Sequence, residues 1–290
     1  MKGLVPVTTR IEQMDFHEPV FIGEIVTMRT KLGYASSRSM MLVVKVYAEN
    51  SKTLTKRHTN TAILWYVALD RSDPKNSRVA SIPPFVPTTE DERDTYAKGE
   101  AMYLKRKKAE EQTRERLASP SPNEEALNPE LYPKEPKAAS PRVSHSQLIH
   151  LMLPSDCTEG GVVQGGVIMK LMDNAAGCVA WRHCLTNVVT VSVEAMEFKA
   201  PIRNGDLVFV DAHLNFVSQK SLEIEIVVEA ESMTSGTRTV TNTGIFKFVS
   251  LDKDHRPVSV RPLLLETRDD VKRFLDGKRR YEEARKSRSK

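Results

Sequence analysis

The chain has 290 residues, a formal net charge of +5 and a pI of about 9.0, with 40% hydrophobic and 28% charged residues. These values describe a globular protein long enough for two domains, and the mild charge suits an anionic small ligand as well as nucleic acid. No apolar run is long enough to cross a membrane and no secretory signal opens the chain, so we expect a cytoplasmic protein, with a mitochondrial form as the alternative. Cys157, Cys178 and Cys184 show no paired spacing, which favours buried thiols in a reducing compartment.

The chain contains a duplication. Residues 14–70 align without a gap with residues 196–252, so that MDFHEPVFIGEIVTM faces MEFKAPIRNGDLVFV and TNTAILWYVALD faces TNTGIFKFVSLD. Both copies contain segments in which apolar residues recur with the period of a strand, as in 40–50 and 221–231. Each copy therefore predicts an antiparallel meander with one face to cover.

The first copy begins after the point where the second copy has a helix. Met1 faces His183 in the alignment, so residues 145–182 have no counterpart, and residues 4–16 correspond to the strand that follows such a helix. We expect the first domain to lack its central helix. Either the chain has an alternative or truncated start, or another element fills the gap.

A charged segment follows each meander. Residues 89–108 resemble residues 267–286, and the sparse apolar positions in both predict exposed helices that pack through one narrow stripe. Six prolines within 118–142 indicate an interdomain linker. The basic runs are interleaved with acidic residues and lack an aromatic platform, so we predict no nucleic-acid binding.

The second copy contains an apolar helix with two glycines at its start, within VVQGGVIMKLMDNAAGCVAW (162–181). Gly165 and Gly166 leave the backbone bare, and the free amides of a first helical turn can bind an anion or a polarised carbonyl oxygen. Close packing of the helix on a strand is the alternative reason for these glycines. Seven positions form a wide apolar face that belongs inside a sheet: Val167, Ile168, Leu171, Met172, Ala175, Cys178 and Val179.

Asp173 lies in the middle of this helix, where a carboxylate is costly to bury unless it is hydrogen-bonded or takes part in catalysis. It is either a structural partner of Asn174 or Lys170, or a general base that activates water, or a direct nucleophile. Gly166 and Asp173 are seven residues apart, about 10.5 Å along the axis. One substrate carbonyl cannot contact both, so each functional group would need a second helix to complete its site.

The segment GGVVQGGVIMKLMDNAAG, with the PIRNGD turn after the next strand, resembles the second half of the cytosolic acyl-CoA thioesterases of the brain acyl-CoA hydrolase type. The resemblance covers essentially the whole chain. It implies two hot-dog domains, each a curved antiparallel sheet around one long helix, in chains that assemble as trimers. It also implies hydrolysis of fatty acyl-CoA to free fatty acid and CoA, with no metal or other cofactor.

The resemblance also assigns roles to single residues. Asp173 matches the catalytic aspartate of the family, and Gly165 and Gly166 match the glycines of its His-Gly-Gly motif. Gln164 replaces the histidine of that motif, which also disfavours a hot-dog dehydratase or hydratase. The other catalytic residue of the family is an asparagine before the first-domain helix, in the segment without a counterpart here; Thr158 holds the matching position in the second copy.

Gln164, Thr158 and Asn174, the last standing where the family commonly has glutamate, are therefore candidate substrate-binding residues. The composite site of the family cannot be completed within one such chain. Symmetric pairing of second-domain helices from two chains is one route to activity. The alternative is a non-catalytic or weakly active acyl-CoA-binding or assembly subunit.

Two equivalent turns carry a cation beside serines, Arg38 with Ser39 in the first copy and Lys220 with Ser221 in the second. Cations and hydroxyls are the donors that the phosphates of CoA require, so these residues are candidate substrate contacts. Ordinary hairpin-turn roles are the alternative.

These patterns predict an α+β protein of two hot-dog domains, the first without its central helix, with a charged helix after each. The expected partners are an acyl-CoA substrate and further copies of the chain; we expect no nucleic acid, no stable membrane insertion and no metal. The expected segments are an incomplete first domain at 1–88, a charged helix and proline-rich linker at 89–142, the second domain at 143–262 and the charged C-terminal helix at 263–290.

Overall fold

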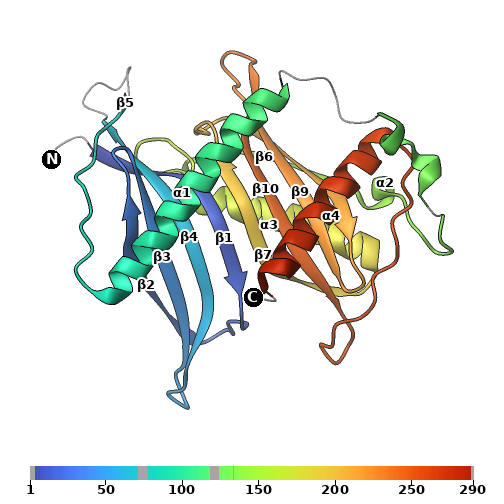
Figure 1. The fold of residues 1–290 in the computed structure, drawn as a ribbon, viewed down its shortest axis with the longest axis horizontal. Helices are drawn as coiled ribbons and strands as arrows, with labels where there is room; N and C mark the ends of the chain where they lie inside the picture. Colours follow the sequence, from blue (N-terminus) through green and yellow to red (C-terminus); the bar gives the residue numbers. More distant parts are fainter. Residues whose placement is uncertain (1–3, 71–77, 118–123, 133, 289–290) are drawn as a thin grey trace. The chain divides into compact units, whose positions relative to one another are not determined.

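The computed structural model describes residues 4–70, 78–117, 124–132 and 134–288. The chain forms two compact units, 1–122 (unit 1) and 123–290 (unit 2). Each unit contains an antiparallel sheet, with one described helix packed on it in unit 1 and helices on both faces in unit 2 (Figure 1). The duplicated meander expected from the alignment is therefore present in both halves.

The sheet of unit 1 has the strand order β2-β3-β4-β1, with the short β5 paired to β4. Its opening strand coincides with residues 4–16, as the alignment predicts. Helix α1 packs on one face through Tyr96 and Tyr103, which contact a cluster of Tyr34, Met41 and Trp65. The elements are β1 (Leu4–Phe16), β2 (Glu24–Ala35), β3 (Ser39–Asn50), β4 (Lys56–Asp70), β5 (Arg78–Val79) and α1 (Glu90–Leu117).

Unit 2 has the strand order β7-β10-β9-β8-β6. The long helix α3 lies on one face of this sheet and α4 crosses the other face (Figure 1). The described residues before the sheet, 124–132 and 134–145, form three short helices: η1 (Glu124–Leu127), η2 (Pro129–Leu131) and α2 (Pro141–Ser144). The other elements are β6 (Ser146–Leu151), η3 (Pro154–Asp156), α3 (Gly165–Cys184), β7 (Asn187–Phe198), β8 (Leu207–Val217), β9 (Ser221–Glu231), β10 (Arg238–Leu251) and α4 (Arg268–Arg288).

The face of the unit 1 sheet that points away from α1 has no helix on it among the described residues. Val26 and Met28 on β2 are 44% and 69% exposed there. Their counterparts in unit 2, Val208 and Val210 on β8, are fully buried because α3 packs on them. Among the described residues, no helix of the first domain corresponds to α3 of unit 2, and an incomplete first domain stays a prediction.

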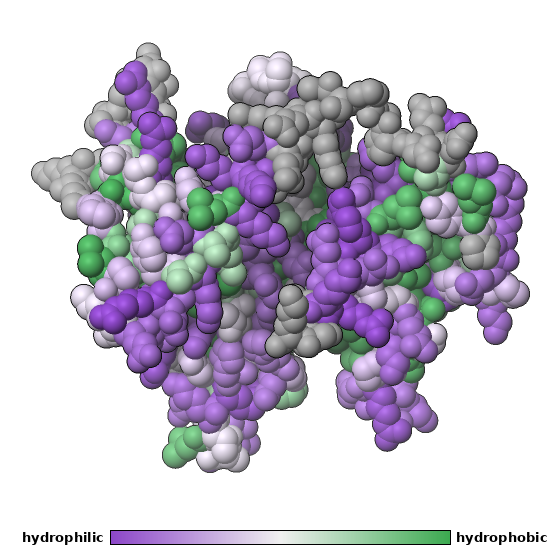
Figure 2. Space-filling model, viewed as in Figure 1, coloured by the Kyte–Doolittle hydropathy of each residue, from purple (hydrophilic) through white to green (hydrophobic). Residues whose placement is uncertain are grey.

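The unit 2 sheet is covered on both faces, which corrects the expectation of a meander with a single face to cover. Glu223 on β9, which the alternation places on the face opposite Leu222 and Ile224, is only 2% exposed because α4 lies over it. Arg280 on α4 donates to its carboxylate at 2.6 Å. The outward surface of α4 is hydrophilic (Figure 2), as its composition predicts.

The buried face of α3 differs in part from the expected one. Ile168, Met172, Ala175 and Val179 are buried as predicted, but Cys178 is exposed. The buried face is shifted around the helix from the expected one, and Cys178 lies on the exposed flank. The residues that complete the buried face are Ala176, Ala180 and His183. The expectation of buried thiols is therefore wrong for Cys178.

Both charged helices approach their sheets at a glycine. A Cβ atom added to Gly277 would lie 2.5 Å from Cβ of Phe216, and one added to Gly99 would lie 2.5 Å from Cβ of Tyr34. We expect Gly277→Ala to lower the free energy of unfolding by about 1–3 kcal/mol, because the helix must move away from the sheet. Gly177→Ala on α3 is the control, since its Cβ meets nothing within 4 Å.

Urea unfolding of the two variants checks this prediction. The control should unfold at an equal or higher urea concentration than the wild type, because alanine favours a helix over glycine by about 1 kcal/mol. Equal unfolding midpoints for Gly277→Ala and the wild type would show that α4 does not depend on this close approach.

Candidate active site

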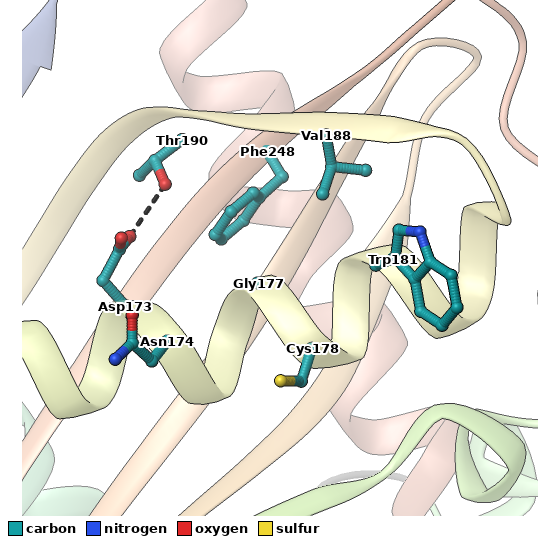
Figure 3. Close-up of a pocket in the computed structure, with 8 residues that line it drawn as sticks. All are labelled: Asp173, Asn174, Gly177, Cys178, Trp181, Val188, Thr190 and Phe248. Carbon is teal, nitrogen blue, oxygen red and sulfur yellow. Dashed lines mark hydrogen bonds between the residues drawn. The ribbon is translucent and has the colours of Figure 1, made fainter.

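Asp173 is half-buried in the middle of α3, beside strand β7. The hydroxyl of Thr190, on β7, donates a hydrogen bond of 2.7 Å to Oδ1 of Asp173 (Figure 3). The partner of the carboxylate is thus a threonine from the next strand, not Asn174 or Lys170. One carboxylate oxygen is held in place, and the group remains at the surface of a pocket.

Thr190 was missed by the sequence analysis. The signal available was its position in NVVTVSV, the strand directly after the helix, where it shares a face with Val188. A strand that follows a helix and packs against it brings such a residue back toward the middle of the helix. The pairing of two particular residues across that contact depends on the register of helix against strand, which the sequence pattern does not specify.

A pocket of about 440 Å³ lies next to the Asp173–Thr190 pair. Its volume falls in the range of small-molecule sites. Figure 3 shows the residues that line the pocket, with the carboxylate of Asp173 at one end and the indole of Trp181 at the other. The lining residues are Asp173, Asn174, Gly177, Cys178 and Trp181 from α3, Val188 and Thr190 from β7, and Phe248 from β10.

The start of α3 keeps its first-turn amides free of a side-chain cap. Gln164 is the N-cap residue, and its side chain makes no hydrogen bond to the helix. A Cβ at Gly165 would lie 3.2 Å from the ring of Phe198, so close packing accounts for that glycine. A Cβ at Gly166 would meet nothing within 4 Å, so packing does not account for the second one. Binding at the amide of Gly166 stays a prediction.

Thr158 lies in the loop before α3 and is exposed. Its backbone N–H and its hydroxyl both donate to the carbonyl of Val162, so the side chain is used within its own loop. The loop is fixed at Asp156, whose carboxylate accepts a hydrogen bond from the N–H of Leu153 and lies 3.3 Å from Nε2 of His150. The backbone N–H of Leu153, and after it His150, lower the pKa of Asp156.

The candidate residues at the start of α3 and those around Asp173 lie at separate places on the helix. Gln164, Gly165 and Gly166 belong to the first turn of α3 and do not line the Asp173 pocket, whereas Asn174 does. The described residues of unit 2 place no second long helix on the same side of the sheet as α3. Completion of each group by a further helix stays a prediction.

The serines of each turn form hydrogen bonds with each other. Ser218 and Ser221 lie 2.7 Å apart through their hydroxyls, and Ser36 and Ser39 lie 2.9 Å apart in the same way. These contacts match the hairpin-turn alternative. Arg38 and Lys220 are exposed beside them, and neither turn lines the Asp173 pocket. Binding of phosphates by these cations stays a prediction.

Other reactive groups of unit 2 are poorly placed for catalysis. Burial raises the pKa of the Cys157 and Cys184 thiols, which disfavours the thiolate. Burial lowers the pKa of His183, whose Nε2 lies 2.9 Å from the carbonyl oxygen of Arg261. Among the described residues there is no group of histidine, cysteine and carboxylate side chains that could hold a metal ion. No described helix is long and apolar enough to cross a membrane.

Comparison with known proteins identifies the family. A model of the thioesterase superfamily matches residues 2–55 and 160–237. The cytosolic acyl coenzyme A thioester hydrolases of Mus musculus and Homo sapiens are each 40% identical over 279 residues, which make up 96% of this chain and 70% of each of those proteins. This chain belongs to the cytosolic acyl-CoA thioester hydrolase family.

Solved structures support the fold of this member of the thioester hydrolase family. An acyl-CoA hydrolase from Bacillus cereus matches with a TM-score of 0.50 at 26% identity, over 53% of this chain and 94% of that one. A hexameric acyl-CoA thioesterase matches with a TM-score of 0.50 at 24% identity, over 52% and 97% of the two chains. The α+β fold with hot-dog domains is therefore confirmed.

Proposed function

We propose that this chain hydrolyses fatty acyl-CoA thioesters to free fatty acid and CoA, with Asp173 as the catalytic carboxylate. The observation that carries the proposal is the Asp173–Thr190 pair at the edge of a pocket whose other walls are mostly apolar. An alkyl chain suits such walls, and a carboxylate held by one hydrogen bond suits the activation of water. The names of the similar hydrolases support the same substrate class.

The proposed reaction needs one water and one proton acceptor. Thr190 holds Oδ1 of Asp173, and Oδ2 accepts a proton from a water whose oxygen attacks the thioester carbonyl carbon. The C–S bond then breaks, and Asp173 returns the proton to the departing CoA thiolate, which leaves as the free thiol. The net change is acyl-CoA plus water to fatty acid plus CoA, and no metal or redox partner enters it.

The carbonyl oxygen needs donors from another helix. We assign this role to the first-turn amides at Gly165 and Gly166 of a second copy, with α3 helices paired symmetrically. Gln164, Thr158 and Asn174 would lie around the thioester, and Arg38, Ser39, Lys220 and Ser221 are the candidate contacts for the CoA phosphates. The resemblance implies trimers, and one similar structure is described as hexameric.

We also propose that the protein works in the cytoplasm, where the names of its relatives place them. The competing function is a binding or assembly subunit that holds acyl-CoA without turnover. It would use the same pocket, so only a measurement of product separates the two.

The test measures free thiol release from decanoyl-CoA and palmitoyl-CoA together with thermal stabilisation by CoA, on the same preparation. The double variant Asp173→Asn/Thr190→Val serves as the blank for contaminating hydrolases. Thiol release well above this blank supports the hydrolase. Stabilisation by CoA with thiol release no faster than the blank would replace it with the binding subunit.

A further inference from the structure

The pocket beside Asp173 has a polar end and an apolar remainder. Asp173, Asn174 and Thr190 form the polar end. Beyond them the walls are apolar or weakly polar, built from two strands and one flank of α3: Gly177, Cys178, Trp181, Val188 and Phe248. Phe248 is 3% exposed and forms the floor, whereas Cys178 and Trp181 border the open side. A ligand with a reactive head and an alkyl tail matches this polarity.

The direction of the pocket follows the helix. Trp181 comes eight residues after Asp173, which is about 12 Å along the axis at 1.5 Å per residue. Figure 3 shows its indole at the end of the row opposite the carboxylate. Gly177 lies halfway, one turn after Asp173, and a Cβ there would meet nothing within 4 Å. The space alongside the helix is therefore open at Gly177, and Trp181 is the last residue of α3 that lines it.

We propose that Trp181 sets the acyl-chain length that this site accepts, with the chain lying along α3 from Asp173 to the indole. An extended alkyl chain advances about 1.25 Å per bond, given bonds of about 1.5 Å and angles near 111°. The span between the two residues therefore holds about ten carbons. This inference rests on the proposed hydrolase function, because it places the thioester at Asp173.

Two substitutions alter the length of the pocket without touching the buried core. The side chain of Trp181 is 57% exposed, so Trp181→Ala removes the end wall at little cost to folding. Gly177→Leu fills the middle of the pocket with a residue that favours helix. Trp181→Phe keeps an aromatic end wall and is the matched control.

The experiment compares kcat/KM on saturated acyl-CoA substrates of four, ten and sixteen carbons. Burial of each CH₂ changes affinity roughly fourfold. We expect Trp181→Ala to raise the ratio of the sixteen-carbon to the ten-carbon substrate at least tenfold, and Trp181→Phe to raise it less than threefold. Gly177→Leu should lower the ratio of the ten-carbon to the four-carbon substrate at least tenfold. Ratios within threefold of wild type in both Trp181→Ala and Gly177→Leu would overturn the proposal.

A binding measurement keeps this proposal separate from the hydrolase proposal. The chain has two tryptophans, and Trp65 is 1% exposed in unit 1, so a ligand in the pocket should change the emission of Trp181 alone. We expect a non-hydrolysable decanoyl-CoA thioether to shift the emission to shorter wavelength, and Trp181→Ala to lose this shift. A shift without thiol release would show that the acyl chain reaches Trp181 and would reject the hydrolase. Release of thiol without any shift would support the hydrolase and overturn the role of Trp181.

Discussion

Asp173→Asn is expected to lower kcat for acyl-CoA hydrolysis by about 10²- to 10⁴-fold, the usual contribution of a positioned general base. The amide has nearly the same size, and its oxygen can still accept the hydrogen bond that Thr190 donates at 2.7 Å. It cannot accept a proton from water. KM should therefore change less than kcat, and thermal unfolding should stay close to that of the wild type.

Thr190→Val is the companion to this substitution. Valine matches threonine in shape but removes the donor to Oδ1 of Asp173. We expect a smaller loss of kcat than in Asp173→Asn, because the carboxylate keeps its chemistry and loses only its orientation. Equal kcat for Asp173→Asn and the wild type would remove Asp173 from the mechanism, whatever the effect of Thr190→Val.

Arg280→Met is expected to destabilise the protein by about 3 kcal/mol. Arg280 donates through Nε and Nη2 to Oε1 of Glu223, at 3.0 Å and 2.6 Å. Removal of one member of a buried pair leaves the other charge without its partner and costs about 3–5 kcal/mol. We expect the lower end because the Arg280 side chain is 31% exposed. Chemical unfolding at neutral pH measures the loss.

The duplication supplies the matched control. Met41 aligns with Glu223, and Met102 on α1 aligns with Arg280, so unit 1 already has two methionines at this contact. Replacement of a buried ion pair by apolar residues of similar volume is often neutral or stabilising. The double variant Glu223→Met/Arg280→Met should therefore unfold within about 1 kcal/mol of the wild type. A double variant as unstable as Arg280→Met would show that α4 requires the ion pair itself.

The difference in stability between the wild type and the Glu223→Met/Arg280→Met variant should depend on pH, and its sign follows from the pKa of Glu223. Burial raises the pKa of the Glu223 carboxyl above its ordinary 4.5, with the hydrogen bond from Arg280 opposing the shift. The folded protein thus holds this proton more tightly than the unfolded chain, so the cost of Glu223 is present at neutral pH and disappears as the pH falls toward 4.5. The wild type should gain stability relative to the double variant on acidification over that window.

The comparison of the two units also shows why the strand pattern misjudged one face of the sheet. Alternation correctly placed Leu222, Ile224 and Ile226 on the buried side of β9. It places Glu223 on the opposite face, where a carboxylate meets water unless another element covers it. The cover is α4, about fifty residues further along the chain, and only its docked position brings Arg280 onto Glu223.

The sequence by itself determined the duplication, the strands, the start of α3 at Gly165, and Asp173 as the residue of interest, because these depend on local periodicity and on the alignment of the chain with itself. Only the tertiary structure decided that Thr190 holds the carboxylate, that Cys178 is exposed and that an apolar pocket ends at Trp181. Those features depend on the rotation of α3 about its axis and on its position along the sheet. That placement is set by side-chain packing between elements, which no local pattern encodes.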